Sequence, residues 1–192
     1  SFYKAMAEDP THAWLITGNR ALETALGGAA RLLCQGTGEK PCGQCKGCVM
    51  RLADAHPDLR TVLLPEDGKA SSIKVEAVRD LRDWLAQASQ YGRKVLVMEG
   101  AERMTEAAQN ALLRSLEEPP AGAYFLLAGE EGGLLPTLRS RLNPLRLGGE
   151  GASPYQEAME PARQQILRAL GGDWNGLSSG YSGKKAELGP VL

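Results

Sequence analysis

The sequence has 192 residues, of which 43% are hydrophobic and 23% are charged, as is typical of a globular chain with one domain and a small appendage. Its 22 Lys and Arg residues against 23 Asp and Glu residues give a net charge of −1, which argues against a globally basic nucleic-acid binder. No run approaches 18 apolar residues and the first residues lack a secretory pattern, so we expect a cytoplasmic protein with no membrane partner.

Apolar runs alternate with amphipathic segments along the first 147 residues. We expect strands at residues 13–17, 60–64, 94–98, 123–128 and 144–147, helices at 20–33, 74–88 and 105–116, and a short helical turn at 134–141. Thr105 is a candidate N-cap, and Pro119 and Pro120 would stop the helix that it begins. Strands that alternate with helices predict an α/β fold in which a parallel sheet is sandwiched between helices.

The composition changes after Leu147. Glycines at 148–151 predict a linker, residues 154–170 are a helix candidate, and the remainder is rich in Gly and Ser, which predicts a flexible tail. We therefore expect a core over 1–147 and a C-terminal part over 148–192 that is helical or flexible and marginal as a second domain.

All four cysteines lie in one short stretch, at Cys34, Cys42, Cys45 and Cys48. Stable disulfides are disfavoured in the cytosol, whereas four thiolates can surround a tetrahedral Zn²⁺. The spacing therefore predicts a small structural zinc module over 34–48, inserted after the first helix. Reduced thiols, two disulfides or a redox pair are the alternatives. His56 is a possible competing ligand, although its position beside a proline is more typical of a loop residue.

The turn after the first strand lacks a complete phosphate-binding loop. In the pattern GxxxxGK[ST], Gly18 is present, but Glu23 occupies the second glycine position and Thr24 the lysine position. After the strand at 94–98, a hydrolase needs an Asp for Mg²⁺ and then an acid to activate water, whereas this sequence has Glu99 and Gly100. Because two independent requirements fail, we predict that the chain does not hydrolyse ATP itself.

Several short motifs follow one another in a distinctive order. Residues 12–16 read His-Ala-Trp-Leu-Ile, 56–58 read His-Pro-Asp, and 75–79 read Val-Glu-Ala-Val-Arg. Residues 110–120 read Asn-Ala-Leu-Leu-Arg-Ser-Leu-Glu-Glu-Pro-Pro, and 137–142 read Thr-Leu-Arg-Ser-Arg-Leu. They resemble, in the same order, the HAxLI, HPD, V-x-x-[VI]-R, NALLKxLEEPP and SRC motifs of the AAA+ clamp-loader family of bacterial DNA polymerase III, whose four-cysteine insertion also follows the first helix.

The resemblance implies an AAA+-type core with a structural zinc ion, acting as a non-hydrolysing stator of the clamp loader. Arg141, the arginine of the SRC-like motif, would reach in trans into the ATP site of a neighbouring motor subunit (tau/gamma) and stabilise charge on the γ-phosphate. The other implied partners are the delta subunit and, through the complex, the sliding clamp and primed DNA.

The remaining motif residues carry weaker expectations. Arg139 and Ser140 belong to the SRC-like motif, and Arg139 would be a supporting or DNA-facing charge. We expect Glu117 and Glu118 to be helix-end and loop acids that fix the following turn, and Asn110 to pack or hydrogen-bond near the decayed nucleotide positions.

The sequence also departs from the family. Leu142 replaces the cysteine of the SRC motif, which predicts a packing change, and the residues after 150 are too few for both a lid and a collar domain, so 154–170 would be a remnant of the lid. Two other functions stay open. One is a zinc-bearing interaction module on an inactive AAA+ core in another DNA transaction. The other is an ATPase with an unorthodox phosphate loop.

Overall fold

The computed structural model describes residues 11–65 and 72–148 of the chain. The expected linker beyond Gly148, the helix at 154–170 and the expected tail lie outside the described residues. Within the described ranges, no helix is long and apolar enough to cross a membrane.

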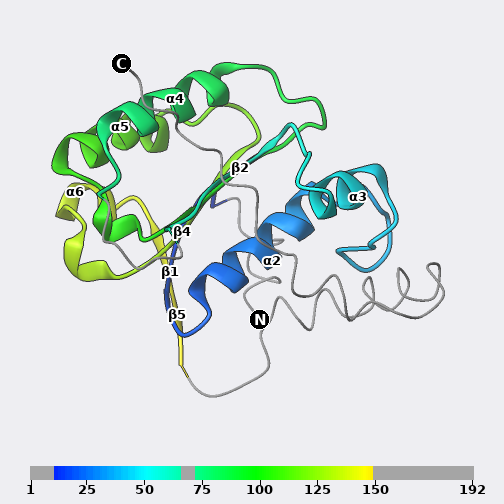
Figure 1. Cartoon of the computed structure of the whole chain (residues 1–192), viewed down its shortest axis with the longest axis horizontal. Helices are drawn as coiled ribbons and strands as arrows, with labels where there is room; N and C mark the ends of the chain where they lie inside the picture. Colours follow the sequence, from blue (N-terminus) through cyan, green and yellow to red (C-terminus); the bar gives the residue numbers. More distant parts are fainter. Residues whose placement is uncertain (1–10, 66–71, 149–192) are drawn as a thin grey trace.

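The centre of the molecule is a sheet of five parallel strands in the order β2-β3-β4-β1-β5 (Figure 1). The strands are β1 (Ala13–Gly18), β2 (Leu59–Val62), β3 (Lys94–Glu99), β4 (Ala123–Ala128) and β5 (Asn143–Leu147). The first strand therefore lies between the last two, with Leu15 opposite Leu127 of β4 and Pro144 of β5.

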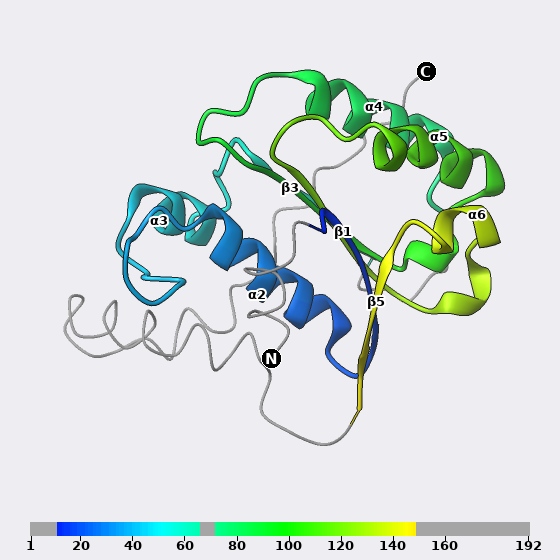
Figure 2. The same cartoon turned by 180° about the vertical axis from the view of Figure 1, so that it is seen from behind.

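Helices cover both faces of this sheet, as Figures 1 and 2 show. They are α2 (Ala21–Leu33), α3 (Lys46–Leu52), α4 (Val75–Ala86), α5 (Glu106–Glu117) and α6 (Pro136–Arg139), with short 3₁₀ turns η1 (Ala101–Arg103) and η2 (Glu131–Gly133). Because side chains alternate along a strand, Val95 and Val97 of β3 pack into the core under α2, while Leu96 and Met98 pack into the core under α4, α5 and α6.

The predicted fold class is confirmed, and every predicted strand and helix of the core is present. Thr105 caps α5 as predicted, with its Oγ1 accepting a hydrogen bond from the backbone N–H of Ala108 at 3.2 Å. The second strand is shorter than predicted because it ends at Val62, and Leu63 beyond it is 48% exposed. Helix α3, inside the cysteine module, was not predicted.

Candidate functional site

The cysteine cluster joins the end of α2 to the start of α3. Cys34 follows the last residue of α2, Cys45 precedes the first residue of α3, and Cys48 lies in the first turn of α3. The Sγ atoms of Cys34, Cys42, Cys45 and Cys48 all lie within 4.8 Å of one another. Those of Cys34 and Cys45 are 3.9 Å apart, close to the ~3.8 Å edge of a tetrahedron with ~2.3 Å metal–sulfur bonds. The four thiols therefore fit a single tetrahedral metal ion.

Backbone N–H groups turn toward these sulfur atoms. Gln35 N–H donates to Cys45 Sγ at 3.3 Å, and Cys42 N–H donates to Cys34 Sγ at 3.4 Å. Burial by itself would raise the pKa of the Cys45 thiol. Hydrogen bonds from the N–H groups of Cys48 and Gln35 and from neighbouring thiols outweigh the effect of burial and lower this pKa to about 6. Burial raises the pKa of the Cys34 and Cys48 thiols. A cation placed among the four sulfur atoms would favour the thiolate form of all of them.

The His-Pro-Asp motif forms hydrogen bonds within its own segment and with residues 89–91, and it adds no ligand to the described cysteine cluster. His56 is buried and its Nδ1 accepts a hydrogen bond from the backbone N–H of Asp58 at 3.1 Å. The Asp58 carboxylate, 1% exposed, accepts hydrogen bonds from Ser89 Oγ and from the backbone N–H groups of Gln90 and Tyr91, at 2.8 to 3.1 Å. Among the described residues, the group that could hold a metal ion consists of the four cysteines and does not include His56. This agrees with the prediction that His56 is a loop residue.

The first nucleotide position is a tight turn. Only Asn19 and Arg20 lie between β1 and α2. Gly18 has a φ of +95°, and a Cβ at this position would lie 2.2 Å from the carbonyl oxygen of Leu147, so the end of β5 closes over it. Thr24, which stands at the lysine position, is fully buried. The turn at Gly18 is thus packed closely against the end of β5, and Thr24 points into the protein interior.

The second motif position, at the end of β3, makes contacts within the chain. Glu99 Oε2 accepts a hydrogen bond from the backbone N–H of Leu64 at 2.8 Å. Gly100 adopts a left-handed φ of +67°, and a Cβ there would lie 2.9 Å from Leu64 Cδ1. Glu99 and Gly100 therefore hold the segment that follows β2.

The SRC-like motif lies at the end of α6, with Arg139 as its last residue and Ser140 as its C-cap. Arg139, Ser140 and Arg141 are all exposed, whereas Leu142 is 6% exposed and belongs to the hydrophobic core. Leu142 therefore packs in the core, and the expected packing change relative to a cysteine stays a prediction. Ser140 Oγ donates to the Thr137 carbonyl oxygen at 3.0 Å, which tightens the turn that presents Arg141.

The predicted helix-end acids differ from each other. Glu117 is the last residue of α5, and its Oε1 lies 2.6 Å from Nη2 of Arg141. Glu118 is exposed and is the C-cap residue. Asn110, which we expected to pack or hydrogen-bond, is exposed on α5, and its neighbour Gln109 is buried instead.

Gln109 connects α5 to the segment that leads into α6. Its Nε2 donates to the carbonyl oxygens of Met104 at 3.1 Å and Gly133 at 2.9 Å, and its Oε1 accepts a hydrogen bond from the backbone N–H of Leu135 at 2.7 Å. All three of these backbone groups would lack this partner without the Gln109 amide. Gln109 therefore fixes where α6 begins, and with it the position of the SRC-like motif.

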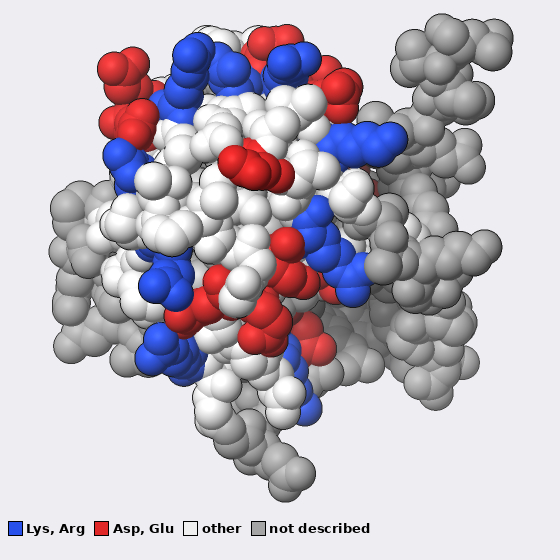
Figure 3. Space-filling view, turned by 90° about the vertical axis from the view of Figure 1, so that its left-hand side faces the viewer, with Lys and Arg blue, Asp and Glu red and all other residues white. Residues whose placement is uncertain are grey.

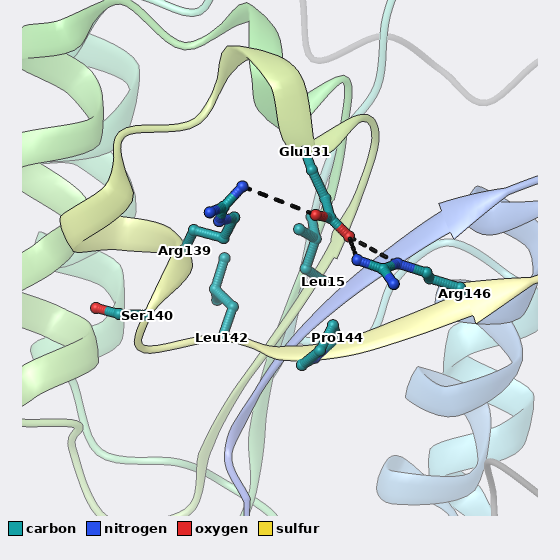
Figure 4. A pocket seen from close by; sticks show the side chains of 7 residues that line it. All are labelled: Leu15, Glu131, Arg139, Ser140, Leu142, Pro144 and Arg146. Atoms are coloured by element: carbon teal, nitrogen blue, oxygen red, sulfur yellow. Dashed lines mark hydrogen bonds and ion pairs between the residues drawn. The ribbon is translucent and has the colours of Figure 1, made fainter.

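A cavity of about 440 Å³ lies beside this motif, between α6 and β5 (Figure 4). Leu15, Leu142 and Pro144 line it, and Glu131 stands between Arg139 and Arg146 at its mouth. Glu131 lies 3.9 Å from Arg139 Nη1 and 2.9 Å from Arg146 Nη2. Arg139 is thus paired within the chain, and the face in Figure 3 carries basic and acidic side chains next to one another.

Sequence analysis missed two of these residues, Gln109 and Lys94, and it also missed the pairing of Glu117 with Arg141. Gln109 bonds to Gly133 and Leu135, and Glu117 pairs with Arg141, all more than 20 residues away, so no local pattern marks these contacts. Lys94 was predicted only as part of a strand. It is 4% exposed, its Nζ donates a hydrogen bond to the carbonyl oxygen of Trp84, and burial lowers its pKa. A charged residue opening an otherwise apolar strand was the available signal.

Comparison with known proteins agrees with the motifs. The family model described as "DNA polymerase III, delta subunit" matches residues 3–150. A DNA polymerase III subunit delta' of Yersinia pestis is 54% identical over 113 residues, which cover 57% of this chain and 33% of the relative. The subunit delta' of Escherichia coli is 46% identical over 138 residues, covering 68% of this chain and 40% of the relative.

A solved structure supports the fold alone. The crystal structure of a DNA polymerase III gamma subunit-related protein from Thermotoga maritima superposes with a TM-score of 0.59 at 22% identity, over 88% of this chain and 55% of that one. The chain spans about a third to two fifths of the length of the curated relatives that it matches. The matched family model and these relatives place the chain in the DNA polymerase III delta-subunit family, as a delta-prime-type subunit of the clamp loader.

Proposed function

We propose that the chain is a non-hydrolysing stator of the DNA polymerase III clamp loader, which supports ATP-driven loading of the sliding clamp onto primed DNA. Its partners in this role are the tau/gamma motor subunit and the delta subunit, and it meets the clamp and DNA through the complex. The observation that carries the proposal is the exposed Arg141, presented at the end of α6 by a short rigid turn. It acts in trans on the ATP bound by the motor subunit.

The chain's own nucleotide positions support the non-hydrolysing part of this proposal. Leu147 closes over Gly18, Thr24 is buried, and Glu99 is engaged with the backbone of Leu64. Among the residues that the structure describes, Glu99 ends β3 with its carboxylate bonded to the Leu64 backbone, and Gly100 after it has no side chain to activate water. The isolated chain is therefore expected not to bind labelled ATP.

The metal that we propose for the cysteine cluster is Zn²⁺, because four thiolates in a tetrahedron are its characteristic structural environment. Cys34, Cys42, Cys45 and Cys48 would hold it. Four protein ligands complete the coordination, so the ion supplies cross-linking of α2 to α3 and no open position for substrate.

The test is the rate of ATP turnover by the motor subunit, assembled with delta, clamp, primed DNA and this chain. Arg141→Ala should lower the turnover number by about tenfold or more, because an arginine supplied in trans is worth ~10³–10⁵ in the best-studied nucleotide hydrolases. Arg79→Ala removes an exposed arginine from α4 and is the matched control, with turnover unchanged.

Assembly has to be measured in the same samples, by size-exclusion chromatography with light scattering. Equal turnover with the native chain and with Arg141→Ala in fully assembled complexes would refute the role of the arginine. Tight binding of labelled ATP to the isolated chain would refute the non-hydrolysing part and favour an ATPase with an unorthodox phosphate loop.

A further inference from the structure

Arg141 is held between two helices. Its Nη2 lies 2.6 Å from Oε1 of Glu117, the last residue of α5. Its Nη1 donates to the carbonyl oxygen of Thr137 in α6 at 2.8 Å. The guanidinium plane is therefore fixed from two sides by contacts that come from different elements.

The base from which Glu117 reaches Arg141 is rigid. Leu116, the preceding residue, is 4% exposed in the core, and its carbonyl oxygen lies 3.2 Å from Nε2 of His12, the residue before β1. At the other end of the contact, Gln109 anchors Leu135 at the start of α6. The backbone that precedes Glu117 and the start of α6 are thus both held by partly buried hydrogen bonds.

The ion pair between Arg141 and Glu117 is too exposed to contribute much to the stability of the fold. The side chains of Arg141 and Glu117 are 38% and 46% exposed, and ion pairs of this kind contribute little net stability in water. What a carboxylate does for a long side chain at such a site is to restrict its rotamers and to orient the planar donor fork. The guanidinium still has donors left over, because its contacts with Glu117, Thr137 and Ser140 engage Nη1 and Nη2 and not Nε.

We propose, resting on the function proposed above, that Glu117 is a positioning residue for Arg141. Its carboxylate holds the guanidinium in the orientation that meets the γ-phosphate oxygens in the neighbouring subunit, so less side-chain entropy is lost when the transition state forms. Glu117 itself touches no phosphate and acts only through Arg141. The opposite role, a lock that keeps the arginine away from the phosphate, predicts faster turnover when the carboxylate is removed.

The experiment compares Glu117→Ala, Glu117→Gln and Arg141→Ala in the assembled clamp loader, with Glu118→Gln as the matched control. Glu118 is the adjacent exposed acid. Glu117→Ala should lower the turnover number about two- to fivefold with the KM for ATP unchanged, the size expected when an exposed ion pair orients a reacting group. Glu117→Gln keeps an acceptor oxygen and should recover part of the loss, and Glu118→Gln should behave as the native chain.

A double variant shows whether Glu117 acts through Arg141. Adding Glu117→Ala to Arg141→Ala should cause no further loss, because the residue to be positioned is gone. An equal further loss, or unchanged or faster turnover with Glu117→Ala alone, would overturn the positioning role. If Arg141→Ala itself has no effect in assembled complexes, the trans role of the arginine in the proposed function fails, which distinguishes the two failures.

A second measurement needs no partner. Side-chain ¹⁵N NMR of the isolated chain should show slow guanidinium rotation for Arg141 and its acceleration in Glu117→Ala. Fast rotation in the native chain would overturn the tether directly, whatever the turnover data show.

Discussion

Polar groups are engaged within the chain at the two decayed nucleotide positions, and they are left exposed at the turn that carries Arg141. At the nucleotide positions, the Glu99 carboxylate is used up by the backbone of Leu64 and the turn at Gly18 is covered by Leu147. At the end of α6, Arg141 is exposed and keeps free donors while two contacts orient it. Under the proposed function, this difference separates positions that the chain closes with its own residues from a group that it keeps open for another subunit.

Removal of the metal should lower the stability of the chain more than any of the substitutions below. It should not change the difference between the nucleotide positions and the turn that carries Arg141. A chelator is expected to cost several kcal/mol of stability, because metal binding is coupled to folding in four-cysteine sites. Loss of amide protection should concentrate in residues 34–52. In Figures 1 and 2, α3 and α6 lie at opposite ends of the molecule, so the effect of Arg141→Ala on turnover should survive wherever the complex still assembles. Hydrogen exchange read by mass spectrometry checks the first expectation. Equal loss of protection around α6 would contradict it.

The substitution Gly18→Ala tests how closely β5 packs against the turn after β1. The new Cβ would lie 2.2 Å from the Leu147 carbonyl oxygen, at a φ of +95°, so we expect a loss of about 2–4 kcal/mol in the free energy of unfolding. Urea denaturation followed by circular dichroism measures it. Gly132→Ala is the control, because no heavy atom lies within 4 Å of a Cβ built there. Equal midpoints for the two variants would mean that β5 does not close over the turn.

The substitution Gln109→Leu should weaken the anchoring of α6, the helix that precedes Arg141. Three backbone groups, at Met104, Gly133 and Leu135, lose their partner, which should cost about 2–3 kcal/mol. Motor ATP turnover should fall as well, since α6 is no longer anchored. Asn110→Ala removes the adjacent exposed amide and should change stability by less than about 0.5 kcal/mol. A Gln109→Leu chain as stable as the native one would remove the argument that this amide fixes α6.

Glu99→Gln should have the smallest effect. The amide oxygen can still accept the hydrogen bond from Leu64, so a loss of no more than about 1 kcal/mol is expected, from the missing charge. ATP turnover by the assembled complex should not change. A large fall in turnover with this variant would show that the end of β3 participates in hydrolysis and would break the contrast between the two regions.

The sequence was sufficient for the core and for the cysteine cluster, for identifiable reasons. Strands such as β3 and β4 are buried on both faces, so each is a nearly continuous apolar run with unmistakable ends. The four cysteines are close in sequence, so spacing alone brings their sulfur atoms together. Helix α3 escaped because it is seven residues long, contains Gly47 and is capped by the cysteine Cys45. The pairing of Glu117 with Arg141 requires the packing of α6 against α5, which no local pattern encodes.

The place of β1 in the sheet has a consequence for how the chain is made. This strand is synthesised first among the five, yet it pairs only with β4 and β5, which are synthesised last. Its apolar run from Ala13 to Ile16 has no neighbour to join until about 110 further residues have left the ribosome. During synthesis this apolar strand waits longest for its sheet neighbours, so the nascent chain should depend on chaperones until β4 and β5 have emerged.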